Sequence, residues 1–305
     1  MEPSPDASDS GLTWRMLATA VLVALVYAAA MLPAFLAGPV WGAVAVAVAV
    51  ALAVLSARAA DRLALYAMDA RLVGPEEEPE LHAIVDRLCV SSGLPKPRVA
   101  VSALDMPNAF AAGSGPGSAV VCVTEGLRAR LEPAELAAVL AHETAHVANR
   151  DVLVTAIASF PGLCAGLLLR WWTGLITGRG RYGAGRAAGM ACGIVLLPLG
   201  AAAAVLFAAG TLTGFGLSRH RELCADSTGA VLTGRPADLA SALGKVTDGI
   251  RDASRDDLRA LRPVSALCVV AARGGGVDAL LSSHPSLERR TERLSAISWR
   301  LESGA

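Results

Sequence analysis

Two histidines and a glutamate stand at a spacing that suits metal binding. Residues 142–146 read HETAH, which matches the pattern H-E-x-x-H. On a helix, side chains four positions apart lie on one face, so His142 and His146 can face one ion. Zinc binds histidine nitrogen and keeps one position for water in catalytic sites. Glu143 can take the proton of that water, so the motif predicts metal-assisted peptide hydrolysis with Glu143 as general base.

The segment around this motif has the features of a helix. Pro133 suits a first helical turn, where its missing N–H costs nothing, and Glu132 and Glu135 favour a helix start. A helix from Pro133 through His146 is therefore predicted. The alternative is a pair of solvated histidines on an amphipathic helix. It is disfavoured because the chain has only 5 His and two of them form this pair.

A third metal ligand must come from elsewhere in the chain. A further histidine six residues after the second one would mark the metzincin class, but Asn149 and Val152 occupy the positions that this class requires as Gly and His. A glutamate from a later helix is the other common solution. Glu222 is the candidate, and Asp226, one turn on, can hydrogen-bond the outer nitrogen of a ligating histidine. His220 is an alternative ligand, although it would face away from Glu222.

The composition indicates a membrane protein. Hydrophobic residues make up 54% of the chain and the mean hydropathy is +0.50, above the roughly 45–50% apolar content of soluble domains. A spanning helix needs about 20 apolar residues. The candidate spans are residues 16–37, 38–57, 152–169 and 187–217. The third is short and contains Pro161, so a buried core helix is an alternative for it.

These spans divide the chain into four parts. They are an N-terminal tail and transmembrane hairpin (1–57), the first half of a protease domain (58–151), a transmembrane pair with an Arg-rich loop (152–217), and the second half of the domain (218–305). With four spans, both halves lie on one side of the membrane and can join. The positive-inside rule favours the cytoplasmic side of the cell membrane, whereas Arg170, Arg179, Arg181 and Arg186 in the loop speak against it.

The polar parts are predicted to hold helices and one small sheet. The expected elements are a helix over 79–92, a strand over 98–104, a hairpin with strands at 108–112 and 118–124, and helices over about 219–232 and 285–301. The formal net charge is zero, so no nucleic-acid partner is indicated. The 6 Cys are scattered singly, which predicts neither a disulfide framework nor a cysteine zinc site.

Four motifs together resemble those of the HtpX-like membrane metalloproteases, relatives of the CAAX prenyl proteases. They are Pro107-Asn108-Ala109-Phe110-Ala111 with Gly113, the HETAH helix with Asn149-Arg150-Asp151, Arg219-x-x-Glu222-x-x-x-Asp226, and Ser283-His284-Pro285 with Glu288-Arg289 and Arg293-Leu294. The resemblance covers nearly the whole chain. It implies an α+β, mainly α fold: a gluzincin-type protease domain with a small sheet, on about four transmembrane helices.

The resemblance also implies roles for particular residues. His142, His146 and Glu222 would hold one Zn²⁺ per chain, with Asp226 behind a histidine. Residues 108–111 (Asn108, Ala109, Phe110 and Ala111) would bind the backbone of a polypeptide substrate by strand addition. His284 would stabilise the tetrahedral oxyanion. For both of the last two, an ordinary structural role is the alternative.

Four functions compete at this stage. The first is an endopeptidase that degrades membrane or misfolded proteins. The second is a selective processing protease for one lipidated or signal-bearing substrate, which is disfavoured because CAAX proteases carry more spans. The third is an intramembrane protease, disfavoured by the charges at both ends of the HETAH helix. The fourth is a non-catalytic transporter or scaffold, disfavoured because the spans contain no Asp, Glu, Lys, Arg or His. Oligomeric state and natural substrates are not indicated by the sequence.

Overall fold

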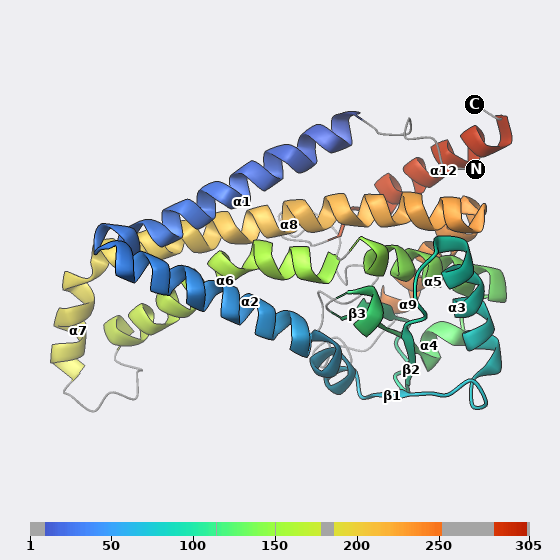
Figure 1. Ribbon diagram of the computed structural model, residues 1–305, viewed down its shortest axis with the longest axis horizontal. Coiled ribbons are helices and arrows are strands. Elements are labelled where there is room, and N and C mark those ends of the chain that lie inside the picture. Colours follow the sequence, from blue (N-terminus) through green and yellow to red (C-terminus); the bar gives the residue numbers. More distant parts are fainter. Residues whose placement is uncertain (1–9, 114, 150, 178–185, 252–283, 304–305) are drawn as a thin grey trace. The chain divides into compact units, whose positions relative to one another are not determined.

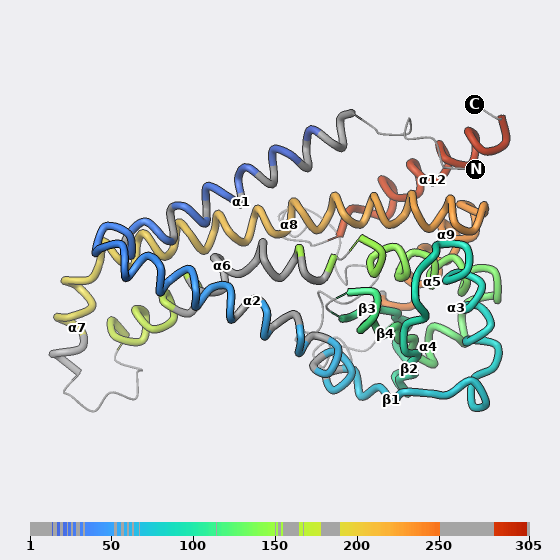
Figure 2. Tube along the Cα trace, viewed as in Figure 1, coloured from blue at the N-terminus to red at the C-terminus, as the bar shows by residue number. Residues whose placement is uncertain are grey.

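The computed structural model describes residues 10–113, 115–149, 151–177, 186–251 and 284–303 (Figures 1 and 2). The chain divides into two compact units: residues 1–53 with 155–217, and residues 54–154 with 218–305. Of the sequence features above, Arg150, Ser283, the tail 1–9 and the loop tip with Arg179 and Arg181 lie outside the described residues.

The first unit is built from long helices. They are α1 (Ser10–Leu36), the first part of α2 (Pro39–Ala67), most of α6 (Asp151–Thr177), α7 (Arg186–Val195), and α8 (Leu197–Thr233) up to Leu217. Gly38 joins α1 to α2 with a φ of 136°, a conformation that side-chain-bearing residues rarely adopt. The predicted turn between the first two apolar segments is therefore present.

The apolar segment 187–217 is interrupted, which differs from the single helix expected there. α7 ends at Val195 and α8 begins at Leu197. Pro198 explains the break, because it has no N–H to offer the carbonyl four residues earlier and its ring crowds that carbonyl. The helix that follows is longer than predicted, since the expected helix 219–232 is the last part of α8 and not a separate element.

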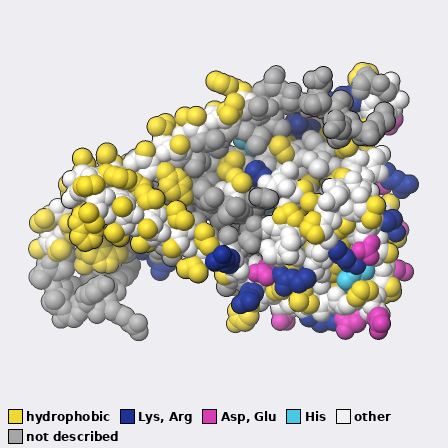
Figure 3. Space-filling view, viewed as in Figure 1, with side chains coloured by type: hydrophobic (Ala, Val, Ile, Leu, Met, Phe, Trp, Pro, Cys, Tyr) yellow, Lys and Arg dark blue, Asp and Glu magenta, His cyan; other side chains and the backbone are white. Residues whose placement is uncertain are grey.

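One helix among the described residues, α8, is long and apolar enough to cross a membrane. Its apolar part ends at Leu217, and the polar part from Ser218 onward belongs to the second unit. In Figure 3, hydrophobic side chains cover most of the described surface of the helical unit, while charged side chains mark the visible face of the second unit. The number of spanning helices stays a prediction.

The second unit contains the predicted sheet. Strands β1 (Ala70–Leu72), β2 (Arg98–Ser102), β4 (Val120–Thr124) and β3 (Ala109–Ala112) lie in that order. β2 and β4 are parallel, whereas β1 with β2 and β3 with β4 are antiparallel. The predicted hairpin is confirmed, with Ala109 opposite Val123 and Ala112 opposite Val120. β3 is thus an edge strand that pairs only with β4 in the described part of the chain.

The second unit also contains helices that pack around the HETAH helix or against the sheet. They are α3 (Pro79–Ser92), α4 (Glu125–Arg128), α5 (Pro133–Ala148), α9 (Pro236–Arg251) and α12 (Leu287–Ser303), the last beginning two residues later than expected. α5 packs against β3, α3 and α9, and α9 packs against α12. The shared core includes Phe110, Leu140, Leu243 and Leu294, all at most 2% exposed. The HETAH helix α5 is therefore held on several sides.

Thr124 fixes the loop that leads into the edge strand. Its hydroxyl donates to the Met106 carbonyl over 2.7 Å and accepts from the Asn108 amide over 2.9 Å. The same oxygen accepts from the Leu127 amide and so caps α4. Gly126 is required here, because a Cβ on it would lie 1.8 Å from the Asp105 carbonyl oxygen. The hydrogen bonds of Thr124 therefore fix the position at which β3 begins.

Candidate metal centre

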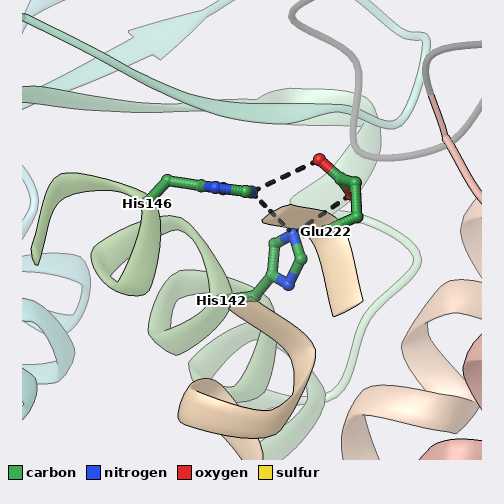
Figure 4. A group of neighbouring side chains, drawn as sticks. All are labelled: His142, His146 and Glu222. Carbon is green, nitrogen blue, oxygen red and sulfur yellow. Dashed lines mark hydrogen bonds and ion pairs between the residues drawn. The ribbon is translucent and has the colours of Figure 1, made fainter. Parts of the chain in front are cut away.

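Helix α5 presents both histidines of the HETAH motif to one point. Its start is fixed by the Glu132 amide, which donates to the Glu135 carboxylate over 2.8 Å. His142 lies in the middle of the helix and is 1% exposed, while His146 lies in its last turn and is partly buried. Figure 4 shows the two rings converging on Glu222. The helical spacing therefore produces the shared face that the sequence predicts.

Glu222 reaches this point because α8 approaches α5 very closely. Gly229, two turns after Glu222, lies against the backbone of His142. A Cβ on it would be 3.0 Å from the His142 nitrogen. Ala225 and Ala145 are completely buried. Only small side chains allow two helix backbones to come this near, and the close approach brings the carboxylate to the histidines.

The three side chains form a compact set of donors. His142 Nε2 lies 3.6 Å from Glu222 Oε2, and His146 Nε2 lies 3.4 Å from Glu222 Oε1. The two Nε2 atoms are 3.1 Å apart. One donor atom from each of the three residues falls within 4.8 Å of the others. Such a set of two imidazoles and a carboxylate is typical of a metal site with an open position.

Each histidine is oriented by an aspartate on its other ring nitrogen. His142 Nδ1 lies 3.0 Å from Asp226 Oδ1, and His146 Nδ1 lies 2.5 Å from Asp151 Oδ2. The His146 contact is a hydrogen bond, whereas the His142 contact is close but lacks good hydrogen-bond geometry. An aspartate at Nδ1 favours a proton there, which leaves the Nε2 lone pair for the centre. The sequence predicts Asp226 behind a ligating histidine, and the structure places it beside His142. The Asp151 contact was not predicted.

The residues present fit a metal ion. Glu222 Oε2 is buried and accepts no hydrogen bond of good geometry from the described residues. The Glu222 carboxylate lies next to the Nε2 atoms of both histidines, with Oε2 nearer His142 and Oε1 nearer His146. A buried carboxylate needs positive charge around it, and Arg290 Nη1, 3.5 Å from Oε2, supplies only part of it, since that guanidinium also pairs with Asp226. A cation held by Glu222 and the two histidines would supply the rest.

The electrostatics favour a cation in the same place. Burial would raise the pKa of Glu222, but His284, His142 and His146 hold that pKa well below its ordinary value. Burial would lower the pKa of His142, but Asp226 and Glu222 raise it overall. Glu222 is therefore ionised at neutral pH, and the histidines lie in a field that attracts positive charge.

Two further predicted residues lie at this centre. Glu143 is 4% exposed and follows His142 directly on α5. His284 is 6% exposed, and its Nδ1 lies 3.1 Å from Glu222 Oε2. The structure therefore brings His284 from a distant part of the sequence to the carboxylate of Glu222.

Comparison with known proteins identifies the family. Residues 75–298 match the model of "Peptidase family M48". The chain belongs to peptidase family M48. It is 47% identical to "Protease HtpX homolog 1" of Streptomyces coelicolor, over 79% of this chain and 78% of that protein. It is 40% identical to "Protease HtpX homolog" of Moorella thermoacetica, over 97% of each. The chain is thus a metalloprotease, as the sequence predicts.

One solved structure was also matched. "Crystal Structure of S. mikatae Ste24p" aligns with a TM-score of 0.45 at 19% identity, covering 74% of this chain and 51% of that one. The family assignment rests on the M48 match and on the curated relatives.

The predicted substrate segment of this M48 peptidase lies along β3. Asn108 precedes the strand, and Ala109, Phe110 and Ala111 belong to it. All four are buried, and the strand packs against α5, the helix that carries the histidines. The segment is therefore an edge strand beside the zinc-motif helix.

Three residues around the metal centre were missed by sequence reasoning. Asp151 contacts His146, Arg221 pairs with Asp151, and Arg290 pairs with Asp226. Asp151 stands five residues after His146, a spacing that does not share a helical face, so periodicity could not find it. Arg290 lies far along the chain from Asp226, and only the motif around His284 pointed to that region.

Proposed function

We propose that this M48 peptidase is a membrane-anchored zinc endopeptidase that cleaves membrane or misfolded polypeptides. The observation that carries the proposal is the convergence of His142, His146 and Glu222, with an aspartate behind each histidine. That arrangement suits a metal ion, and Glu143 beside it suits a general base. Two imidazoles and one carboxylate are a frequent donor set of catalytic zinc, with one ion per chain.

The bound metal would supply a Lewis acid that polarises the scissile carbonyl and lowers the pKa of water. The chain's own residues do the rest. Glu143 accepts the proton of the attacking water and passes it to the leaving amine. His284, across from Glu222, donates a hydrogen bond to the developing oxyanion. Asp226 and Asp151 keep both ligand histidines in the correct tautomer. No covalent enzyme intermediate is needed.

The edge strand offers a means of binding polypeptides without sequence preference. β3 pairs on one side with β4, and within the described residues no second strand pairs with Ala109–Ala112, so a substrate strand could add to that side. Strand addition uses backbone hydrogen bonds, which every extended peptide can make. Such binding suits misfolded segments better than a single processed substrate.

The membrane arrangement is part of the same proposal. We propose four spanning segments, with residues 58–151 and 218–305 forming one split protease domain on the cytoplasmic side of the cell membrane. Support comes from the long apolar helix α8 and from the apolar first unit. Glu222 and the HETAH motif can meet only if both domain halves lie on the same side.

Metal content and cleavage test the proposal together. Zinc would be measured by mass spectrometry on detergent-purified wild type, Glu143→Gln and Glu222→Ala, and each would be assayed for casein cleavage. We expect about one zinc per chain in wild type and in Glu143→Gln. Cleavage should fall at least about 100-fold in Glu143→Gln, and both zinc and cleavage should be lost in Glu222→Ala. The exposed Glu288→Ala serves as the control.

Two results would overturn the proposal. Cleavage that survives Glu143→Gln would exclude this residue as the general base. If Glu222→Ala keeps the zinc content and activity of wild type, Glu222 is not the third ligand. The proposal that residues 58–151 and 218–305 form one domain around a shared metal would then fail.

A further inference from the structure

Arg290 is the largest side chain in the described residues that is almost completely enclosed. It lies on α12 and is 1% exposed. Arginine is rarely buried to this extent unless it is paired, because removing its charge from water costs free energy. None of the roles given above to the metal centre uses it.

Its guanidinium group contacts two carboxylates of the metal centre at once. Nε donates to Asp226 Oδ2 over 2.8 Å and Nη2 donates to Asp226 Oδ1 over 2.7 Å, a two-armed pairing. The remaining arm, Nη1, lies 3.5 Å from Glu222 Oε2. One side chain therefore spans the residue that orients His142 and the residue that would bind the metal.

We infer that Arg290 is a positioning residue of the metal centre, which holds Asp226 and Glu222 in the geometry that binds the ion. The inference rests on the proposed zinc site. Asp226 is completely buried and shares its Oδ1 between His142 and Arg290. The two carboxylates would repel each other in this enclosed space, and the guanidinium group between them removes that repulsion.

The shape of the guanidinium group matters as well as its charge. Its planar fork matches both oxygens of one carboxylate and leaves a third nitrogen for a second acceptor. A lysine ammonium is a point charge and cannot span both carboxylates with the same directions. A lysine at this position would keep the charge balance but would orient Asp226 less firmly.

This role gives α12 a place in the metal centre. Asp226 and Glu222 belong to α8, His142 belongs to α5, and α12 packs against α9, which packs against α5. Arg290 and His284 are contributed by the C-terminal region. The metal centre is therefore complete only when Arg290 and His284 lie against Asp226 and Glu222. The affinity for metal should then depend on how firmly α12 is held in that position.

The test is zinc affinity in the full-length, detergent-purified protein, measured by competition with a chelator of known affinity. The variants are Arg290→Met and Arg290→Lys. The control is Arg289→Met, which makes the same change at the neighbouring exposed arginine. We expect the dissociation constant for zinc to rise about 10–100-fold in Arg290→Met and about 10-fold in Arg290→Lys. Arg289→Met should match wild type.

Two further measurements separate positioning from simple stabilisation. The visible absorption spectrum of the Co²⁺-loaded protein should change in Arg290→Lys, because the ligand geometry relaxes, and kcat should fall more than KM changes. Thermal unfolding of the metal-free variants measures the fold itself. Should Arg290→Met fail to fold, Arg290→Lys carries the test.

The outcomes are distinct. Wild-type zinc affinity and a wild-type Co²⁺ spectrum in Arg290→Lys would overturn the inference, even with a lower melting temperature, since Arg290 would then only stabilise the fold. Equal losses in Arg289→Met would overturn it too. If wild type itself binds no zinc, the proposed zinc site fails, which is a separate result.

Discussion

The two histidines of the HETAH motif are supported in the same way but to different degrees. Behind each one lies an aspartate, and behind each aspartate lies an arginine. His142 and its aspartate are almost fully buried, whereas the His146 side chain is 15% exposed. The arginine behind His142, Arg290, is 2% exposed in its side chain, and Arg221 behind His146 is 12% exposed.

The position along α5 adds to this difference. His142 lies in the middle of the helix, with Gly229 of α8 against its backbone. His146 lies in the last turn, and its partner Asp151 is the first residue of the next helix, α6. One histidine is thus fixed by packing and by buried charge. The other is fixed mainly by a contact between two helix ends, so it should have more freedom to adjust.

The largest expected effect comes from replacing each of the two aspartates by asparagine. In Asp226→Asn, an amide would face the N–H groups of Arg290 and leave a buried charge without its carboxylate, at a cost of about 3 kcal/mol. The dissociation constant for zinc should rise about 100-fold. In Asp151→Asn, the freed Arg221 is nearer to solvent, so about 10-fold is expected. Chelator competition and thermal unfolding of both variants measure this, and equal losses would contradict the comparison.

The sequence predicts the residues of this site but not the difference between the two histidines. The spacing of His142 and His146 on one helix and the spacing of Glu222 and Asp226 on another follow from helical geometry, which is local. Pro133 marked the start of α5 correctly, and the edge strand after Pro107 was found from its turn residues. The family, the protease activity and the mainly helical fold with a small sheet followed from these motifs.

The rest depends on contacts between distant segments. Arg290 meets Asp226 across 64 positions of sequence, and no periodicity relates the two. Gly229 reads as an ordinary helical glycine until the backbone of His142 is seen beside it. The break at Leu196 was missed because a continuous apolar run hid the effect of Pro198. Burial, which distinguishes the two histidines, is a property of the packed unit and not of local sequence.

An intermediate effect is expected when the close approach of the helices at His142 is disturbed. In Gly229→Ala the added methyl would lie 3.0 Å from the His142 nitrogen and 3.1 Å from its Cα, so α8 must move by a few tenths of an ångström. We expect a loss of about 1–3 kcal/mol of stability and weaker zinc binding. The matched control is Gly244→Ala in α9, where no atom lies within 4 Å of the added methyl.

The control should behave in the opposite sense. Alanine stabilises a helix interior by roughly 0.5–1 kcal/mol relative to glycine, so Gly244→Ala should unfold at a slightly higher temperature with unchanged zinc affinity. If Gly229→Ala also stabilises the protein, then the contact at His142 is not tight and the two histidines are held alike.

The smallest effect on the metal is expected at the far end of α5. Glu135 accepts hydrogen bonds from Ser241 over 2.7 Å and from Lys245 over 2.7 Å. Burial would raise the pKa of Glu135, but these partners and the Glu132 amide lower it overall. Glu135→Gln should therefore cost on the order of 1–2 kcal/mol at neutral pH. Zinc affinity of the folded protein should not change, because both histidine supports stay intact.

The pH dependence of stability distinguishes the contribution of Glu135 from that of the metal centre. A carboxylate with a lowered pKa in the folded state stabilises the fold above its ordinary pKa of about 4.5, and this contribution is lost as the pH falls through the folded-state value. The difference in melting temperature between wild type and Glu135→Gln should thus be full at pH 7 and shrink below about pH 4.5. The other carboxylates affect both proteins equally, so their contribution cancels in the difference in melting temperature. A difference in melting temperature that stays constant down to pH 3 would show that Glu135 acts through packing. A loss of zinc affinity at pH 7 in Glu135→Gln would show that the ligand histidines depend on the whole of α5 and not only on Asp226 and Asp151.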